Sequence, residues 1–209
     1  MTRIGVRVTG TAIAVATLLT VGWGSDASAE ILAAWDFENV EPGSLTVDAS
    51  YGSGVLDLGT LGAVSTTFQG TTLNAPFDWG PGNALAFVGL PSEGGGMTIS
   101  ADDVLGPVDV SFAARRSPTG ARWVDAEFWD GRGWVPAATF EVADDWVVYA
   151  FEIPKSPALD RIFLRLTPAG TESPNGTIRF DNLIIESAVP SPGGVALAAI
   201  AGSRLRRRR

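Results

Sequence analysis

Short apolar runs follow one another along most of this chain, and Gly, Pro, Asn and Asp residues separate them. In residues 108–112 and 124–128, apolar or small residues alternate with polar ones, which predicts strands with one face against a core and the other in water. Residues 146–151 and 162–164 are apolar at consecutive positions, which predicts central strands or a covered face. The whole pattern predicts nine strands, at residues 31–37, 84–88, 97–100, 108–113, 122–129, 134–141, 146–153, 161–166 and 177–185.

Turn-forming sequences lie between nearly all of these strands, for example at residues 118–120, 130–133 and 173–176. No long stretch has the 3.6-residue period of an amphipathic helix. Regular short strands of this kind predict an all-β fold with a single antiparallel β-sandwich, and within that class we expect a jelly roll. Residues 41–82 are rich in Gly, Thr and Ser, and we expect long loops there with one or two irregular strands.

The N-terminal end carries a different pattern. Arg3 and Arg7 flank the start of an apolar stretch whose core is residues 11–21, and residues 27–29 have the A-x-A form of a cleavage site. We therefore expect an exported protein with a signal peptide at residues 1–29. The alternative is a membrane anchor, for which the apolar run is shorter than the ~20 residues that a spanning helix needs.

The tail at residues 189–209 has a Pro-x-Pro motif, a short apolar run expected to be helical, and a terminal arginine cluster. In this it resembles the PEP-CTERM sorting signal of Gram-negative bacteria, through Pro190, Pro192, Arg206, Arg207, Arg208 and Arg209. The resemblance implies processing by an exosortase-type membrane protease and transient membrane association through the tail. It also implies delivery of the domain at residues 30–188 to the cell surface, outer membrane or extracellular matrix.

Charge and two missing residue types restrict the chemistry. The whole chain has a net charge of −8, and residues 30–188 alone hold eight basic and twenty-two acidic residues, a net charge of −14. Such a surface repels phosphate backbones, so nucleic acid is not an expected partner. The chain has no Cys and no His, which excludes ordinary structural zinc sites and the Ser-His-Asp and Cys-His catalytic arrangements.

Three segments of the domain match motifs of a known group of folds. Residues 34–38 match an opening strand that ends in Phe-Glu, residues 178–185 a closing strand with an Asp-Asn step, and residues 110–120 a middle strand and turn. Through them the domain resembles the carbohydrate-binding-module-like jelly rolls of bacterial exported proteins. The resemblance implies extracellular polysaccharide as the partner.

The same resemblance implies a structural calcium ion, the one cofactor expected, where the first and last strands lie side by side. Its expected ligands are Glu38 and Asp181, with Asp36 as a further candidate. Calcium takes six to eight oxygen ligands, which carboxylates and backbone carbonyls at strand ends can supply. The alternative is that these acids only form turns and hydrogen bonds at the strand ends.

Asp125 and Glu127 lie two residues apart in an expected strand, and therefore on one face of it. Glycoside hydrolysis requires a pair of carboxylates, and this segment is similar to the acidic motif of sandwich-fold glycosidases with the acid types exchanged. The alternative is an ordinary row of solvent-facing side chains, with Phe128 buried beneath it.

Aromatic and basic residues supply the candidate ligand-binding side chains. Trp79, Trp129 and Trp134 fall at expected loops and could stack on sugar rings, with packing inside the protein as the alternative. Arg116 lies beside the turn at residues 118–120 and could grip an acidic sugar, with ion pairs to nearby acids as the alternative. The tryptophans within expected strands are assigned to the core: Trp35, Trp123 and Trp146.

The sequence thus predicts an exported, non-catalytic surface or matrix protein that binds extracellular polysaccharide. A first alternative is a carboxylate-dependent glycoside hydrolase or lyase that uses Asp125 and Glu127. A second is a purely structural matrix component.

Overall fold

The structure, a computed structural model, describes residues 29–41, 43–59, 64–89, 95–154 and 160–188. Residues 1–28 of the expected signal peptide and the whole expected sorting tail, residues 189–209, lie outside these ranges. The described part contains a short 3-10 helix, η1 (Pro76–Asp78), and thirteen strands: β1 (Ile31–Trp35), β2 (Thr46–Asp48), β3 (Tyr51–Gly52), β4 (Gly54–Asp57), β5 (Val64–Gln69), β6 (Asn83–Val88), β7 (Met97–Ala101), β8 (Val108–Arg116), β9 (Trp123–Trp129), β10 (Trp134–Glu141), β11 (Val147–Ile153), β12 (Ile162–Ala169) and β13 (Thr177–Ser187).

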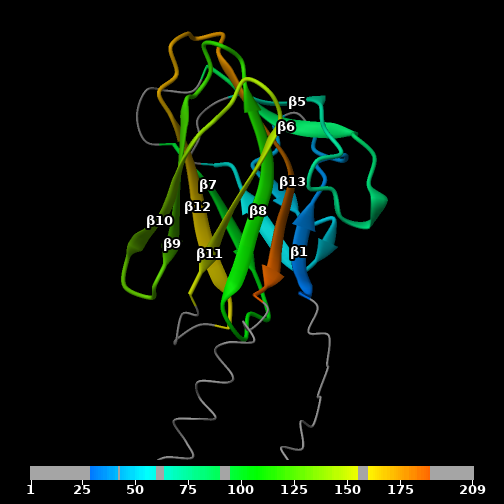
Figure 1. Cartoon of the computed structure of the whole chain (residues 1–209), viewed down its shortest axis with the longest axis vertical. Coiled ribbons are helices and arrows are strands. Elements are labelled where there is room, and N and C mark those ends of the chain that lie inside the picture. The colour runs from blue at the N-terminus through cyan, green and yellow to red at the C-terminus, as the bar shows by residue number, and fades with distance from the viewer. Residues whose placement is uncertain (1–28, 42, 60–63, 90–94, 155–159, 189–209) are drawn as a thin grey trace, which may run out of the picture.

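The strands form two antiparallel sheets packed face to face (Figure 1). One sheet has six strands in the order β10-β9-β12-β7-β4-β2. The other sheet has seven strands. Five of them are neighbours in the order β11-β8-β13-β1-β3, while β6 pairs with β13 and β5 pairs with β6. This arrangement confirms the predicted all-β, jelly-roll sandwich. Among the described residues, no helix is long and apolar enough to cross a membrane.

Alternation places the core between the sheets. Buried and half-buried residues alternate along the whole of β12 and over residues 108–112 of β8. Phe112 and Phe180 of the seven-stranded sheet meet at 5.8 Å between ring centres. Trp35 is fully buried and donates from Nε1 to the carbonyl of Val47, 3.1 Å away in the opposite sheet. Its assignment to the core is confirmed.

Strand β13 changes partner halfway along. Residues 177–180 pair with β6 and residues 183–186 with β1, while β8 lies along the other side. The change occurs at Asp181 and Asn182, where the register shifts and Asn182 has a φ of +46°. Asn is among the few side chains that tolerate this conformation. The first and last strands are therefore side by side, as the resemblance implied.

Two expectations about strands are wrong. Residues 41–82 were expected to hold one or two irregular strands, but β2, β3, β4 and β5 all lie in this segment. Short strands rich in Gly, Thr and Ser give a weak apolar pattern, so they escape detection. Strand β11 was expected to be central or covered, yet it is an edge strand, with Val147 and Val148 about 40% exposed.

Candidate functional site

The outer face of the six-stranded sheet gathers several of the predicted residues. Because residues two apart in a strand share a face, β9 presents Trp123, Asp125, Glu127 and Trp129 in one row. Six residues of strand cover roughly 20 Å, so the row is several sugar units long. We call this row, with the outward side chains of β10 and β12 beside it, the β9 surface.

One end of the β9 surface is aromatic. Trp129 and Trp134 pair directly across β9 and β10, and their rings meet edge to face at 5.7 Å. The hairpin between them is fixed by Asp130, whose Oδ1 accepts hydrogen bonds from the amides of Arg132 (2.8 Å) and Gly133 (2.9 Å). These hydrogen bonds hold the pKa of Asp130 below its usual value. The two predicted platform residues are thus in contact, half-buried at the ends of their strands rather than in loops.

The centre of the β9 surface is polar. Glu127 accepts hydrogen bonds at Oε2 from Arg165 of β12, from Nε at 2.9 Å and from Nη2 at 2.5 Å. Asp125 accepts one at Oδ1 from the Thr139 hydroxyl of β10, at 2.7 Å. An open recess of about 330 Å³ lies over this centre, and Thr167 and Pro136 are among the other residues that line it.

The other end of the β9 surface is again aromatic. Trp123 is 38% exposed, so its assignment to the core is wrong. Its ring packs beside the guanidinium of Arg122, 5.3 Å from the ring centre. The sequence missed Trp123, Arg165, Thr139 and Thr167 as surface residues. Period-two alternation from Asp125 does place Trp123 outward, and this was the one available signal.

Asp125 and Glu127 do share a face, but their environment does not resemble that of a catalytic pair. Glu127 is held in place by two hydrogen bonds from the guanidinium of Arg165. Asp125 is engaged by Thr139, and the recess above both is open. Phe128 was expected to be buried beneath the row; it is partly buried and packs against the core.

The other two predicted ligand-binding residues lie away from this surface. Trp79 follows η1, and its ring is 6.0 Å from that of Phe77, which in turn contacts Tyr51 of β3 at 4.7 Å. Tyr51 belongs to the seven-stranded sheet. Trp79 therefore joins a second aromatic cluster and does not extend the pair of Trp129 and Trp134.

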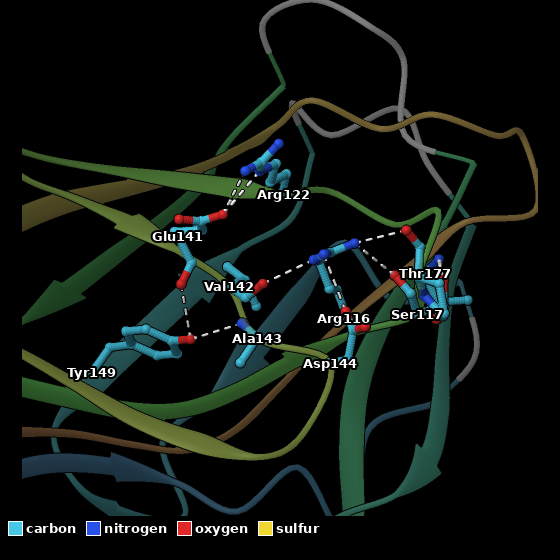
Figure 2. A network of polar contacts seen from close by, with 10 residues as sticks. Arg116, Ser117, Arg122, Glu141, Val142, Ala143, Asp144, Tyr149 and Thr177 are labelled. Atoms are coloured by element: carbon cyan, nitrogen blue, oxygen red, sulfur yellow. Dashed lines mark hydrogen bonds and ion pairs between the residues drawn. The ribbon is translucent and has the colours of Figure 1, made fainter.

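Arg116 is engaged within the protein (Figure 2). Its guanidinium donates to the carbonyl oxygens of Val142 and Pro118, both at 2.8 Å, and pairs with Asp144 at 3.1 Å. Figure 2 shows the side chain pointing into the turn after β10. These contacts match the alternative reading of Arg116, in which it pairs with a nearby acid. The side chain joins β8 to the turn after β10.

The acids expected to bind calcium come together where β13 changes partner. Asp181 is buried and accepts backbone hydrogen bonds from Thr71 (2.7 Å) and Asn182 (2.9 Å). The pKa of Asp181 is raised to about 7, mainly by burial and in smaller part by the nearby charges of Glu38 and Asp36. Asp36 is occupied by a turn, in which its Oδ1 accepts from the Ser50 hydroxyl and the Glu38 amide.

Two glycines keep space open around these acids. A Cβ at Gly70 would collide with Oδ2 of Asp181 and with the carbonyl oxygen of Pro81, and one at Gly82 would collide with the carboxylate of Glu38. Carboxylate and carbonyl oxygens are the ligands that calcium prefers. Within the described residues, no three acidic side chains form a metal site by themselves. Calcium would therefore need Glu38, Asp181, the carbonyl of Pro81 and water, and this donor set fits it.

Comparison with known proteins gives likenesses of fold. No family model matches the chain, and no curated protein matches it. The CBM22-1 xylan-binding domain of Paenibacillus barcinonensis Xyn10C aligns over 98% of its length with 78% of this chain, at 16% identity and a TM-score of 0.47. CBM29_1, a family 29 carbohydrate binding module from Piromyces equi, aligns over 91% of its length with 77% of this chain, at 16% identity and a TM-score of 0.43. The K2 cleaved adhesin domain of Lys-gingipain aligns over 97% of its length with 74% of this chain, at 10% identity and a TM-score of 0.46. These likenesses concern the arrangement of the strands alone.

Proposed function

We propose that this domain is a polysaccharide-binding module without catalytic activity, and that the β9 surface is its binding site. The observation that carries the proposal is the order of side chains along the row: an aromatic end at Trp129 and Trp134, a polar centre, and a second aromatic end at Trp123. Aromatic rings stack on the apolar faces of sugars, and polar groups between them can hydrogen-bond to hydroxyl groups.

The signal peptide and sorting tail expected from the sequence would give this activity an extracellular setting. A domain exported by its signal peptide and released from its tail by an exosortase-type protease would meet polysaccharide at the cell surface or in the matrix. Calcium bound by Glu38 and Asp181 would tie β1 to β13 and stabilise the fold, with no part in ligand chemistry.

Binding to the β9 surface can be tested by affinity electrophoresis of the protein in gels that contain xylan, glucomannan or other soluble polysaccharides. We expect retardation in at least one gel, lost in Trp134→Ala and in Trp123→Ala. Trp79→Ala is the matched control, because it removes the same ring from the other aromatic cluster and should leave the retardation unchanged.

Two results would replace this proposal. Release of reducing sugar that disappears in Glu127→Gln would support the glycoside hydrolase or lyase. Absence of both retardation and sugar release over a broad polysaccharide panel would support the structural matrix component.

A further inference from the structure

The outer face of the seven-stranded sheet carries two neighbouring arginines. Arg115 of β8 and Arg179 of β13 are direct partners across the two strands. Like charges in this arrangement destabilise a sheet. Burial lowers the pKa of Arg179, and the charge of Arg115 lowers it further. The pair therefore has an electrostatic cost in the folded protein.

Neither guanidinium has an anionic partner among the described residues, although the chain has 23 acidic residues and a net charge of −8. Each of the other strand or loop arginines that forms an ion pair does so with one acid: Arg116 with Asp144, Arg122 with Glu141, Arg161 with Asp102 and Arg165 with Glu127. Charge pairing thus occurs elsewhere on the described protein and is missing where Arg115 and Arg179 lie opposite each other.

An aromatic ring lies beside the pair. The guanidinium of Arg179 is 4.3 Å from the ring centre of Phe68 on β5, and Phe68 is 37% exposed. Stacking on the ring holds the guanidinium in a fixed orientation. Between these strands, β6 presents Ala84 and Ala86, both fully buried. Small side chains there leave the arginines and the ring as the groups that a ligand would meet.

We propose that Arg115, Arg179 and Phe68 form a second binding surface, for polysaccharide that carries uronate carboxylates, on the face opposite the β9 surface. A guanidinium fork matches the two oxygens of a carboxylate, and Phe68 offers an apolar face to the sugar ring that bears it. The positive charge is local, and the rest of the protein is acidic and repels the dense negative charge of nucleic acid. A polysaccharide with one carboxylate per sugar is repelled less. A domain with both surfaces could join two polysaccharide chains.

The surface can be tested by titration calorimetry of the protein with a short oligogalacturonate and with the same oligomer fully methyl-esterified. We expect binding to the acid form, at least tenfold weaker binding to the ester, and at least a tenfold loss in Arg115→Gln and in Arg179→Gln. Arg132→Gln, which removes a charge from the exposed hairpin after β9, is the matched control and should bind as the unchanged protein does.

Three outcomes would overturn the proposal: no binding of the acid form, equal binding of the ester, or unchanged binding in Arg115→Gln. Equally tight, Arg115-dependent binding of single-stranded DNA would also overturn the assignment to uronates. Trp134→Ala should leave oligogalacturonate binding intact. A failure of the β9 surface can therefore be told apart from a failure of this one.

Discussion

Arg165 of β12 and Trp134 of β10 are in contact across the intervening strand β9, with the guanidinium 4.6 Å from the ring centre. The same guanidinium makes two hydrogen bonds to Glu127. One side chain therefore fixes both the aromatic end and the polar centre of the β9 surface. A lysine cannot keep this geometry, because its ammonium lacks the planar fork.

We expect Arg165→Lys to weaken polysaccharide binding about fivefold to tenfold, or about 1 kcal/mol, in the affinity gels. The melting temperature should change little, since the pair is partly exposed. Arg161→Lys is the control, because Arg161 also pairs with an acid, Asp102, and lies near an aromatic ring, Phe163. Equal loss of binding in both variants would contradict a specific role for Arg165.

The buried ring of Trp35 packs against Gly54, where a larger residue would leave no room for it. A Cβ at Gly54 would lie 2.8 Å from Cη2 of Trp35 and 2.7 Å from the carbonyl oxygen of Ser100. We expect Gly54→Ala to lower the free energy of unfolding by about 1–3 kcal/mol, as overpacked cores do, measured by urea denaturation. Gly106→Ala is the control, because no atom lies within 4 Å of a Cβ there. Equal stability of the two variants would contradict this packing.

The sequence predicted the sandwich because alternation and turn residues act locally. All nine expected strands are present, and the hairpin signal at residues 130–133 correctly joins β9 to β10. What escaped prediction depends on contacts between strands distant in sequence. Arg165 meets Glu127 only because β12 lies beside β9. The pairing of Arg115 with Arg179 likewise joins residues 64 positions apart in the numbering.

Three acids form a row on the outer face of the seven-stranded sheet. Asp109 of β8 pairs directly with Glu152 of β11 and with Glu186 of β13. Burial raises the pKa of Glu186, and the charge of Asp109 raises it further. A carboxyl group whose pKa is raised by folding contributes stability at acid pH and loses it as the pH rises through the folded-state pKa.

Asp109→Asn should therefore increase the free energy of unfolding at about pH 7, by roughly 0.2–1 kcal/mol. At about pH 3, below the raised pKa of Glu186, that carboxyl group is neutral, so its repulsion with Asp109 is absent and the gain should shrink. Urea denaturation at the two pH values measures both effects. Asp145→Asn, at an exposed position, is the control that removes the same charge elsewhere. A gain at acid pH as large as that at neutral pH would contradict repulsion as the cause.

Calcium binding at Glu38 and Asp181 can be measured as a change in thermal stability. A ligand present at 100 times its Kd and bound only by the folded protein stabilises it by about 2.7 kcal/mol, which raises the melting temperature by several degrees. We expect this rise when calcium replaces EDTA, and its loss in Glu38→Gln. Asp78→Asn is the control, because Asp78 lies in the same loop region and Asn tolerates its positive φ. The same calcium effect in Glu38→Gln would contradict the site.

The hydroxyl group of Tyr149 forms hydrogen bonds to the connection that runs from β10 in one sheet to β11 in the other. It accepts a hydrogen bond from the amide of Ala143 at 3.0 Å and donates one to the carbonyl of Glu141 at 3.1 Å (Figure 2). Its ring stacks on Phe112 in the core, with 5.7 Å between ring centres. Tyr149→Phe keeps this stacking but leaves both backbone groups without that partner.

We expect Tyr149→Phe to lower the free energy of unfolding by about 1–3 kcal/mol, the usual cost of unsatisfied polar groups in a partly buried site, measured by urea denaturation. Tyr51→Phe is the matched control, because Tyr51 is 47% exposed and its hydroxyl has no hydrogen-bond partner among the described residues. That variant should unfold at the same urea concentration as the unchanged protein. An equal and small effect of the two substitutions would mean that water replaces the Tyr149 hydroxyl.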